Sequence, residues 1–276
     1  MRVVAWVRAS HAGPTAVVTL ITAALSATTG SPLGTVLLVT GAELAGQLSI
    51  GWSNDAVDAE RDLAVGRRDK PVVAGHVSAR ALWSGAAVAL GLCAVLSLLT
   101  GPLPGVLHLI AVGSAWAYNL RLKSTAWSWA PYAVSFALLP AFVVLATPGR
   151  TSPPLALLLA GGLLGVGAHL ANTLPDLEDD VATGVRGLPH RWGRRTTAVV
   201  APAVLAAGLV AGLTLVAPER PVPAGLLGAT GLAVAAAAAV VGVTRPRSRA
   251  PFVLTMLVAV LCVIALLFGG RSAVGA

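Results

Sequence analysis

Apolar residues dominate the chain in long runs, separated by short breaks that contain glycine, proline or charged residues. A membrane-spanning helix requires about 20 predominantly apolar residues. By that measure the pattern predicts nine spans, at approximately 12–29, 32–52, 79–100, 102–120, 129–147, 153–174, 197–217, 222–243 and 250–268. The first run is too long, and too closely followed by others, to be a cleaved signal peptide. The sequence therefore predicts an all-α integral membrane protein.

Composition supports this fold class and narrows the environment of the protein. The chain of 276 residues is 56% hydrophobic and only 11% charged, whereas soluble domains carry about 25% charged residues. Cys93 and Cys262 both lie inside apolar runs, so they form no disulfide framework. The net charge of +8 comes from basic residues dispersed among short loops, which argues against a nucleic-acid partner. Abundant Ala, Val, Gly and Arg indicate a GC-rich bacterial genome, and hence a plasma-membrane protein.

The distribution of basic residues predicts the orientation of the nine spans. Lys and Arg are concentrated in cytoplasmic loops of membrane proteins. If the N-terminus is cytoplasmic, 16 of the 19 basic residues lie on that side, and only Arg150, Arg220 and Arg271 lie outside. The seven tryptophans fall at or near the cytoplasmic ends of spans, where amphipathic rings favour the interface. We therefore expect a cytoplasmic N-terminus and an external C-terminus.

Nine of the 11 acidic residues fall in two loops, both on the predicted cytoplasmic side. Asp55, Asp58, Glu60, Asp62 and Asp69 follow the second span, and the second group is Asp176, Glu178, Asp179 and Asp180. The loops lie four spans apart, which indicates a weak internal repeat. We expect a single domain of two four-helix halves, about 1–128 and 129–243, plus a ninth helix at about 250–268.

Spacing places the acidic side chains of each loop on one helix face. Asp55, Asp58 and Asp62 stand at i, i+3 and i+7, and Asn54 precedes Asp58 by one turn. Asp176 and Asp180 stand at i, i+4, and Asn172 and His169 lie one and two turns before Asp176. Clustered carboxylates require a cation, and Mg²⁺ commonly bridges carboxylates to substrate phosphates. The alternative is a solvated, charged loop.

Basic residues near both acidic loops favour a substrate with a diphosphate leaving group. Arg67, Arg68 and Lys70 follow the first cluster of aspartates, and Lys123 lies just after the end of the fourth span. The positive-inside rule explains most of the arginines. Lys70 and Lys123 are stronger candidates for phosphate binding, because they are the only lysines in a chain that otherwise uses arginine. With an apolar cavity beneath, these features indicate a lipid diphosphate whose allylic carbon is ionised.

These motifs resemble those of the UbiA superfamily of intramembrane prenyltransferases. Asn54-Asp55-x-x-Asp58-x-x-x-Asp62 is similar to its first aspartate-rich motif and Asp176-x-x-x-Asp180 to its second. The stretch from Tyr118 to Thr125 is similar to its short motif after the fourth helix, and Arg67 to Ser78 to a further motif of an Arg-Pro-Leu-x-x-Gly type. Two departures are Lys70 before the proline and a second motif that follows Pro175 and carries the extra acids Glu178 and Asp179.

The resemblance implies a helical barrel around a central cavity and Mg²⁺-dependent transfer of a prenyl group from its diphosphate to an acceptor, with an aromatic acceptor as the commonest case. It implies metal binding by Asp55, Asp58, Asp62, Asp176 and Asp180. Asn54 would lie beside them, and Arg67, Lys70 and Lys123 would contact the diphosphate.

Polar residues inside predicted spans are functional candidates because charge is costly there. Glu43 lies near the middle of the second span and His169 within the sixth. Either could hydrogen-bond or deprotonate an acceptor hydroxyl. Asn172 lies on the same polar stripe of the sixth span as His169. The alternative for both residues is a structural hydrogen bond between helices. His108 is expected to be an interhelical histidine. Tyr118 could shield a carbocation with its ring face.

Two other functions fit parts of this pattern. A UbiA-type terpene cyclase would ionise the same diphosphate without an acceptor, but the aromatic content of 5% and the polar stripes favour a transferase. A transporter would also carry intramembrane charge and repeated halves. It would place carboxylates near mid-membrane, whereas here nine of 11 acids lie at span ends.

Overall fold

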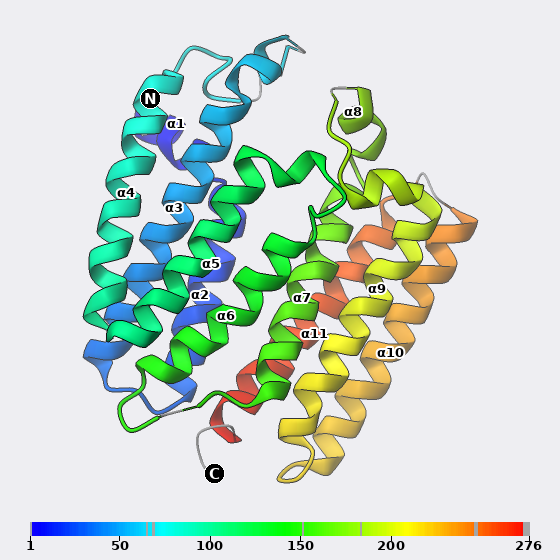
Figure 1. The fold of residues 1–276 in the computed structure, drawn as a ribbon. Coiled ribbons are helices and arrows are strands. Elements are labelled where there is room, and N and C mark those ends of the chain that lie inside the picture. Colours follow the sequence, from blue (N-terminus) through cyan, green and yellow to red (C-terminus); the bar gives the residue numbers. More distant parts are fainter. Residues whose placement is uncertain are drawn as a thin grey trace.

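The protein is a bundle of long α-helices (Figure 1). The computed structural model describes residues 2–64, 66–67, 70–150, 152–182, 184–245 and 248–272. Its helices are α1 (Arg2–Ala9), α2 (Ala12–Thr28), α3 (Leu33–Ala64), α4 (Ala79–Leu99), α5 (Pro102–Leu120), the 3₁₀ turn η1 (Leu122–Ser124), α6 (Ala130–Ala146), α7 (Leu155–Thr173), α8 (Leu177–Ala182), α9 (Leu188–Val216), α10 (Pro221–Thr244) and α11 (Ala250–Ser272).

Each of the nine predicted apolar runs coincides with a long helix. Within the described residues, six helices are long and apolar enough to cross a membrane, namely α3, α4, α7, α9, α10 and α11. The apolar helices α2 and α6 are shorter, with 17 residues each. The chain is therefore a multi-pass membrane protein.

Three features differ from the sequence expectation. Helix α3 continues 12 residues past the predicted end of its span, to Ala64, and the first acidic motif is helical, as its one-face spacing required. Helix α9 begins at Leu188, before the predicted span at 197–217, and turns sharply at Gly193. The φ of Gly193 is 78°, a value that glycine adopts without strain. The short helices α1 and α8 were not predicted, because neither is long or apolar enough to register as a span. Helix α1 is held by Trp52, whose indole Nε1 donates to the Trp6 carbonyl at 3.0 Å.

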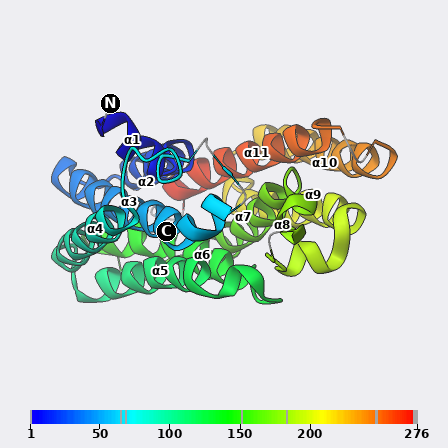
Figure 2. The ribbon, with the colours of Figure 1, turned by 90° about the horizontal axis from the view of Figure 1, so that it is seen from above.

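Six helices form a closed ring that surrounds the centre of the bundle. In ring order they are α2, α3, α5, α6, α7 and α11, and α11 closes the ring by packing against both α7 and α2 (Figure 2). Helix α4 packs outside α3 and α5, and α10 packs outside α9 and α11. Each helix satisfies its own backbone hydrogen bonds, so the ring can enclose a protected interior.

Small residues let α6 and α7 approach closely on one side of this ring. An added Cβ at Gly161 would lie 2.2 Å from the Phe136 carbonyl oxygen, and one at Gly165 would lie 2.4 Å from the Tyr132 carbonyl oxygen. Helix pairs in membranes are stabilised by such close backbone packing. The contact fixes the height and rotation of α6, which carries Tyr132, Ser135 and Phe136 towards the interior.

We predict that Gly165→Ala destabilises the protein by about 1 to 3 kcal/mol, because α6 must shift to admit the methyl group. The control is Gly113→Ala on α5, where no atom lies within 4 Å of the added Cβ. Thermal unfolding in detergent measures both. Equal midpoints for the two variants would contradict the assigned α6–α7 contact.

Candidate active site

The carboxylates of the first acidic motif are buried where α3 reaches the end of the bundle. Asp55, Asp58 and Asp62 are 2%, 7% and 4% exposed, although they occupy the last three turns of a helix. They share one face of α3, as their spacing predicts. Burial of several like charges requires compensating cations close by.

Two lysines supply much of that compensation. Lys70 Nζ lies 2.6 Å from Asp55 Oδ1, and Lys123 Nζ forms an ion pair with Asp58 Oδ1. These are the only lysines of the chain, and they come from two different loops. These contacts hold both loops over the end of α3.

Further basic groups complete the surroundings of the motif. His11 Nε2 lies 2.9 Å from Asp55 Oδ1, and Arg61 Nη2 lies 3.0 Å from Asp58 Oδ2 and 3.6 Å from Asp62 Oδ1. Arg67 follows α3 and is exposed, with its backbone N–H donating to the Asp62 carbonyl at 3.0 Å. Arg68 and Asp69 lie outside the described residues.

One oxygen of the motif is left without a protein partner. Asp55 Oδ2 is buried and accepts no hydrogen bond from the described residues. A buried, unsatisfied carboxylate oxygen is costly. Oxygen atoms of this kind, in a cluster balanced by movable ammonium groups, fit the ligand preference of Mg²⁺.

The second acidic motif begins where α7 ends. Helix α7 stops at Thr173, two residues before Pro175, which cannot continue it. Asp176 is exposed in the connecting turn, and its carbonyl accepts from the Asp180 N–H at 2.8 Å as α8 begins. Asp180 Oδ2 lies 3.2 Å from His190 Nε2. Glu178 pairs with Arg194 on the outer side of this turn, and the side chain of Asp179 is outside the described part.

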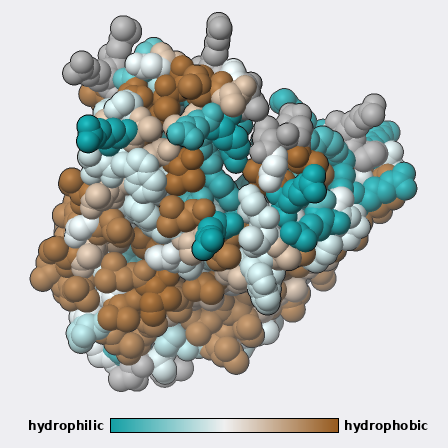
Figure 3. Space-filling model, turned by 45° about the horizontal axis from the view of Figure 1, so that its top comes forward, coloured by the Kyte–Doolittle hydropathy of each residue, from teal (hydrophilic) through white to brown (hydrophobic). Residues whose placement is uncertain are grey.

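The two motifs lie at the same end of the bundle (Figure 1). Gly187 packs directly on the loop that carries Lys123, since a Cβ there would lie 2.8 Å from the Lys123 carbonyl oxygen. Hydrophilic residues gather around this end, whereas apolar residues cover much of the rest of the face (Figure 3).

The five predicted metal-binding aspartates nevertheless do not form one ligand cluster. Within the described residues, no three His, Cys, Asp or Glu side chains converge on a common point. The first-motif carboxylates instead contact lysine, arginine and histidine. Cationic side chains therefore bind the carboxylate oxygens that were expected, from the sequence, to bind metal.

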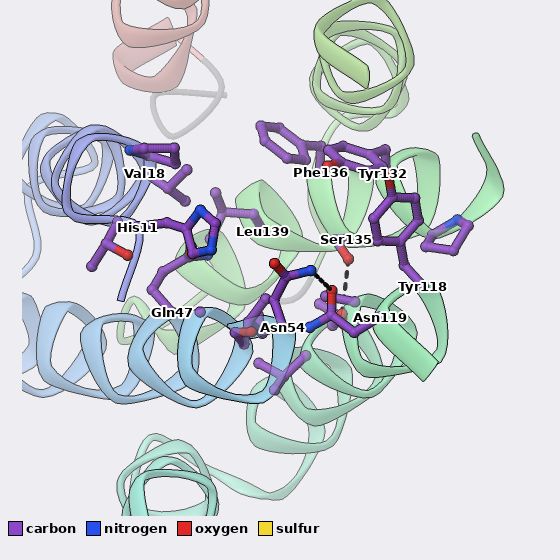
Figure 4. Close-up of a pocket in the computed structure, with 18 of the residues that line it drawn as sticks. His11, Val18, Gln47, Asn54, Tyr118, Asn119, Tyr132, Ser135, Phe136 and Leu139 are labelled. Carbon is purple, nitrogen blue, oxygen red and sulfur yellow. Dashed lines mark hydrogen bonds between the residues drawn. The ribbon is translucent and has the colours of Figure 1, made fainter. Parts of the chain in front are cut away.

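A cavity of about 360 Å³ lies inside the helix ring below these motifs. Asn54, Tyr118, Asn119, Tyr132 and Asn172 line it on the side of the motifs, and the lining side chains from α2, α5 and α6 are mainly apolar. Figure 4 shows four of these polar residues, Asn54, Tyr118, Asn119 and Tyr132, around the cavity. Asn54 Nδ2 donates to Asn119 Oδ1 at 3.1 Å, and Asn119 Nδ2 donates to the Ile50 carbonyl and to Ser53 Oγ. Asn119 thus fixes the orientation of Asn54.

His169 is placed behind the cavity wall and is not among the residues that line the cavity. Its ring stacks on Tyr132 with centroids 4.7 Å apart, and Tyr118 meets Tyr132 edge-on at 5.1 Å. Ser128 Oγ accepts from the Leu188 N–H at 2.9 Å and lies 3.0 Å from His169 Nε2. Since the Leu188 amide can only donate, the Ser128 hydroxyl proton is free to point to His169. The arrangement makes His169 a support for the tyrosines.

Glu43 reaches the deep part of the cavity. Its Oε2 lies 3.0 Å from His108 Nε2, and its Oε1 accepts from Gln47 Nε2 at 2.8 Å. His108 therefore links α5 to α3, which confirms the expectation of an interhelical histidine. Glu43 itself both makes this structural bond and lines the cavity.

Sequence reasoning missed several residues of the site. His11 and His190 bind acidic-motif carboxylates, and Tyr132 lines the upper cavity. For Tyr132 a signal exists, because Ser135 and Phe136 follow it at i+3 and i+4 and share its helix face. No local sequence pattern could have identified the two histidines, because each is brought to its aspartate only by the tertiary fold.

Comparison with known proteins identifies the family to which this architecture belongs. Residues 15–261 match the model of the UbiA prenyltransferase family. The chain belongs to the UbiA prenyltransferase family. No curated protein matches this UbiA-family chain.

Solved structures share its fold at low sequence identity. A UbiA homologue from Archaeoglobus fulgidus bound to GPP and Mg²⁺ is 14% identical, with 99% of this chain and 100% of that chain covered and a TM-score of 0.72. A UbiA homologue from Aeropyrum pernix K1 is 18% identical over 90% and 95%, with a TM-score of 0.69. A structure of digeranylgeranylglyceryl phosphate synthase is 15% identical, with 100% of this chain and 99% of that chain covered and a TM-score of 0.72.

We predict that Lys123→Met destabilises the metal-free protein by about 2 kcal/mol, because Asp58 loses a charged partner in a largely buried position. Mg²⁺ should recover most of this loss by replacing the missing charge. Thermal unfolding with chelator, with Mg²⁺ and with an equal ionic strength of NaCl separates metal binding from screening. Recovery by NaCl alone would argue against a metal site at Asp58.

Proposed function

We propose that this UbiA-family protein transfers a prenyl group, in a Mg²⁺-dependent reaction within the membrane, from an isoprenyl diphosphate to an aromatic acceptor. The observation that carries the proposal is a cluster of carboxylates paired with lysines above an apolar cavity. A prenyl diphosphate has an apolar chain that would match the cavity and a polyanionic head that would match the lysines and metal-binding carboxylates. The A. fulgidus homologue bound to GPP and Mg²⁺ supports this choice of donor.

The residues of the two motifs would hold the metal and the diphosphate. Asp55, Asp58 and Asp62 of the first motif and Asp176 and Asp180 of the second would hold Mg²⁺. When bound there, Mg²⁺ neutralises the negative charge that grows on the leaving diphosphate. Lys70 and Lys123 would move from carboxylates to phosphate oxygens, Arg67 would also contact the diphosphate, and Asn54 would lie beside them.

The remaining site residues would guide the reaction. The bond between the allylic carbon and the diphosphate oxygen breaks with its electron pair on oxygen, and the acceptor supplies the pair for the new bond. The acceptor then loses a proton, which the released diphosphate can accept. Tyr118 and Tyr132 lie at the top of the cavity, where their ring faces can stabilise the allylic cation. His169 positions these rings from behind, and Asn172 lines the wall between them and the second motif.

The orientation and domain organisation follow from the same proposal. The acidic loops would face the cytoplasm, where soluble prenyl diphosphates and Mg²⁺ are available, with the N-terminus on the same side. The chain would cross the bacterial plasma membrane nine times, as one domain made of two four-helix halves and α11. A transporter becomes the weaker reading because the acidic motifs gather at one end of the bundle.

We predict that Asp58→Ala and Asp180→Ala each lower diphosphate release by at least about 100-fold, since each removes charge stabilisation of the leaving group. Glu219→Ala, in the loop between α9 and α10, is the control. Size-exclusion profiles and thermal unfolding confirm that the variants remain folded. Full turnover in either aspartate variant would refute the metal assignment.

The decisive assay supplies purified protein with C10, C15 and C20 prenyl diphosphates, with Mg²⁺ or with chelator, and without acceptor. A transferase releases little diphosphate until an acceptor is added. Mg²⁺-dependent release with cyclic hydrocarbon products would instead identify a terpene cyclase.

We predict that a reporter fused after Ala276 reports an external C-terminus and that one fused before Met1 reports a cytoplasmic N-terminus. The expectation rests on 16 of 19 basic residues falling on one side of nine spans. Paired alkaline phosphatase and fluorescent protein fusions provide the measurement. Both termini on one side would mean an even number of spans.

A further inference from the structure

His11 lies at the corner between α1 and α2, beside the first acidic motif, and its side chain lines the cavity (Figure 4). Its backbone is left-handed, with φ 54° and ψ 56°. Among the described residues it is the only residue other than glycine with a positive φ. Residues with a Cβ rarely adopt this conformation, and the strain persists only where the surrounding structure fixes it.

Contacts of the neighbouring backbone hold this corner on α3. The Ser10 carbonyl packs against Gly51, where an added Cβ would lie 2.4 Å from the carbonyl oxygen. The same carbonyl accepts from Thr15 Oγ1 at 2.7 Å. Helix α1 is fixed separately, through the indole contact described above. The corner therefore stays in place without a bond from the His11 ring.

The position of the corner brings the His11 ring to Asp55. Gly51 precedes Asp55 by four residues, so the two lie on one face of α3, a single turn apart. His11 Nε2 lies 2.9 Å from Asp55 Oδ1, and Lys70 Nζ lies 2.6 Å from the same oxygen. Because a carboxylate paired with an ammonium group can only accept, His11 Nε2 donates the proton of its contact.

The two oxygens of Asp55 have different surroundings. Oδ1 accepts from both Lys70 and His11, whereas Oδ2 is buried and accepts no hydrogen bond from the part of the chain that the structure describes. Two donors on one oxygen fix the rotation of the carboxylate. Oδ2 is therefore the oxygen of Asp55 that remains for a cation.

Lys70 and His11 differ in their freedom to leave Asp55. Lys70 has a long, flexible side chain on the loop between α3 and α4, and in the proposed function it moves to a phosphate oxygen. His11 has a short side chain on a backbone that is seated on α3. Of the two donors to Oδ1, only His11 would remain on Asp55 after the diphosphate binds.

We propose that His11 is a positioning residue for the metal site, whose Nε2–H holds Asp55 Oδ1 so that Oδ2 is presented to Mg²⁺ both before and after Lys70 moves to the diphosphate. A donor to the second oxygen of a metal-binding carboxylate orients that carboxylate and raises metal affinity. This inference rests on the proposed function and adds to its site a residue outside both acidic motifs. If the His11–Asp55 bond served only to hold the corner, metal affinity would not depend on it.

The test measures binding of Mn²⁺, in place of Mg²⁺, to purified protein without prenyl diphosphate, from the electron paramagnetic resonance signal of the free ion. His11→Ala should weaken the Mn²⁺ affinity by about tenfold. His11→Gln, whose side-chain amide can donate to Asp55, should stay within about threefold of wild type. The control is Val7→Ala, which changes an exposed side chain of α1 and should leave the affinity unchanged.

Asp55→Asn in the same assay verifies that the measured site includes Asp55, and its Mn²⁺ affinity should fall further than that of His11→Ala. An affinity in His11→Ala equal to or above that of wild type would overturn the proposal, because His11 would then be neutral to the metal or compete with it. The absence of a Mn²⁺ site in wild-type protein would overturn it as well.

His11→Gly separates positioning from stability. Glycine adopts a positive φ without strain, so with chelator this variant should unfold at a higher temperature than His11→Ala. Its Mn²⁺ affinity should nevertheless be as weak as that of His11→Ala, since both variants lack the imidazole. Recovery of metal affinity in His11→Gly, in step with its stability, would mean that His11 only holds the corner, against the proposal.

These measurements require no prenyl transfer, so they distinguish this inference from the proposed function. Weak Mn²⁺ binding in His11→Ala and His11→Gly supports the inference even if no acceptor is prenylated, an outcome that would defeat the proposed function only. Where transfer is observed, His11→Ala should raise the Mg²⁺ concentration for half-maximal turnover about tenfold and leave kcat at saturating Mg²⁺ within about threefold. A loss of kcat that Mg²⁺ does not recover would argue against a role in metal positioning.

Discussion

The pairing of buried carboxylates with two lysines is the interaction on which this site depends. Asp55 and Asp58 are forced into the interior because α3 runs on past its apolar segment and is covered by the loops after it. Unpaired, these carboxylates would cost several kcal/mol each. Lys70 and Lys123 remove that cost and draw two loops onto the mouth of the cavity. Ammonium groups that hold carboxylates in this way are suited to exchange partners with a metal-bound diphosphate, because the total charge stays balanced.

The membrane imposes a second constraint, which shapes the cavity below. Every polar side chain in that interior must find a partner, and the polar residues of its deep part meet this demand with the chain of contacts from Gln47 through Glu43, His108 and Ser97. The close packing of α6 on α7 shapes the opposite wall, where Phe136 and Leu139 face an apolar space. The helix ring therefore presents a polar wall on one side of its interior and an apolar wall on the other.

Much of the fold was predictable because it follows from local sequence. The nine apolar runs coincide with nine helices, since run length and the flanking Gly and Pro residues set where a helix can lie in a membrane. The helical face of Asp55, Asp58 and Asp62 follows from a period of 3.6 residues, and the end of α7 follows from Pro175. Helices α1 and α8 escaped prediction because short helices depend on what they pack against.

The sequence by itself determined which residues are candidates for the chemistry: the two acidic motifs, the two lysines and the intramembrane Glu43 can all be read from residue type and spacing. Only the tertiary structure decided their partners. Lys123 meets Asp58 across 65 residues, His11 meets Asp55 across 44, and His108 meets Glu43 across 65. It also placed His169 behind the tyrosines and away from the cavity. The physical reason is that helical periodicity fixes which side of one helix a residue occupies, whereas the neighbour it meets there depends on how separate helices pack around the ring.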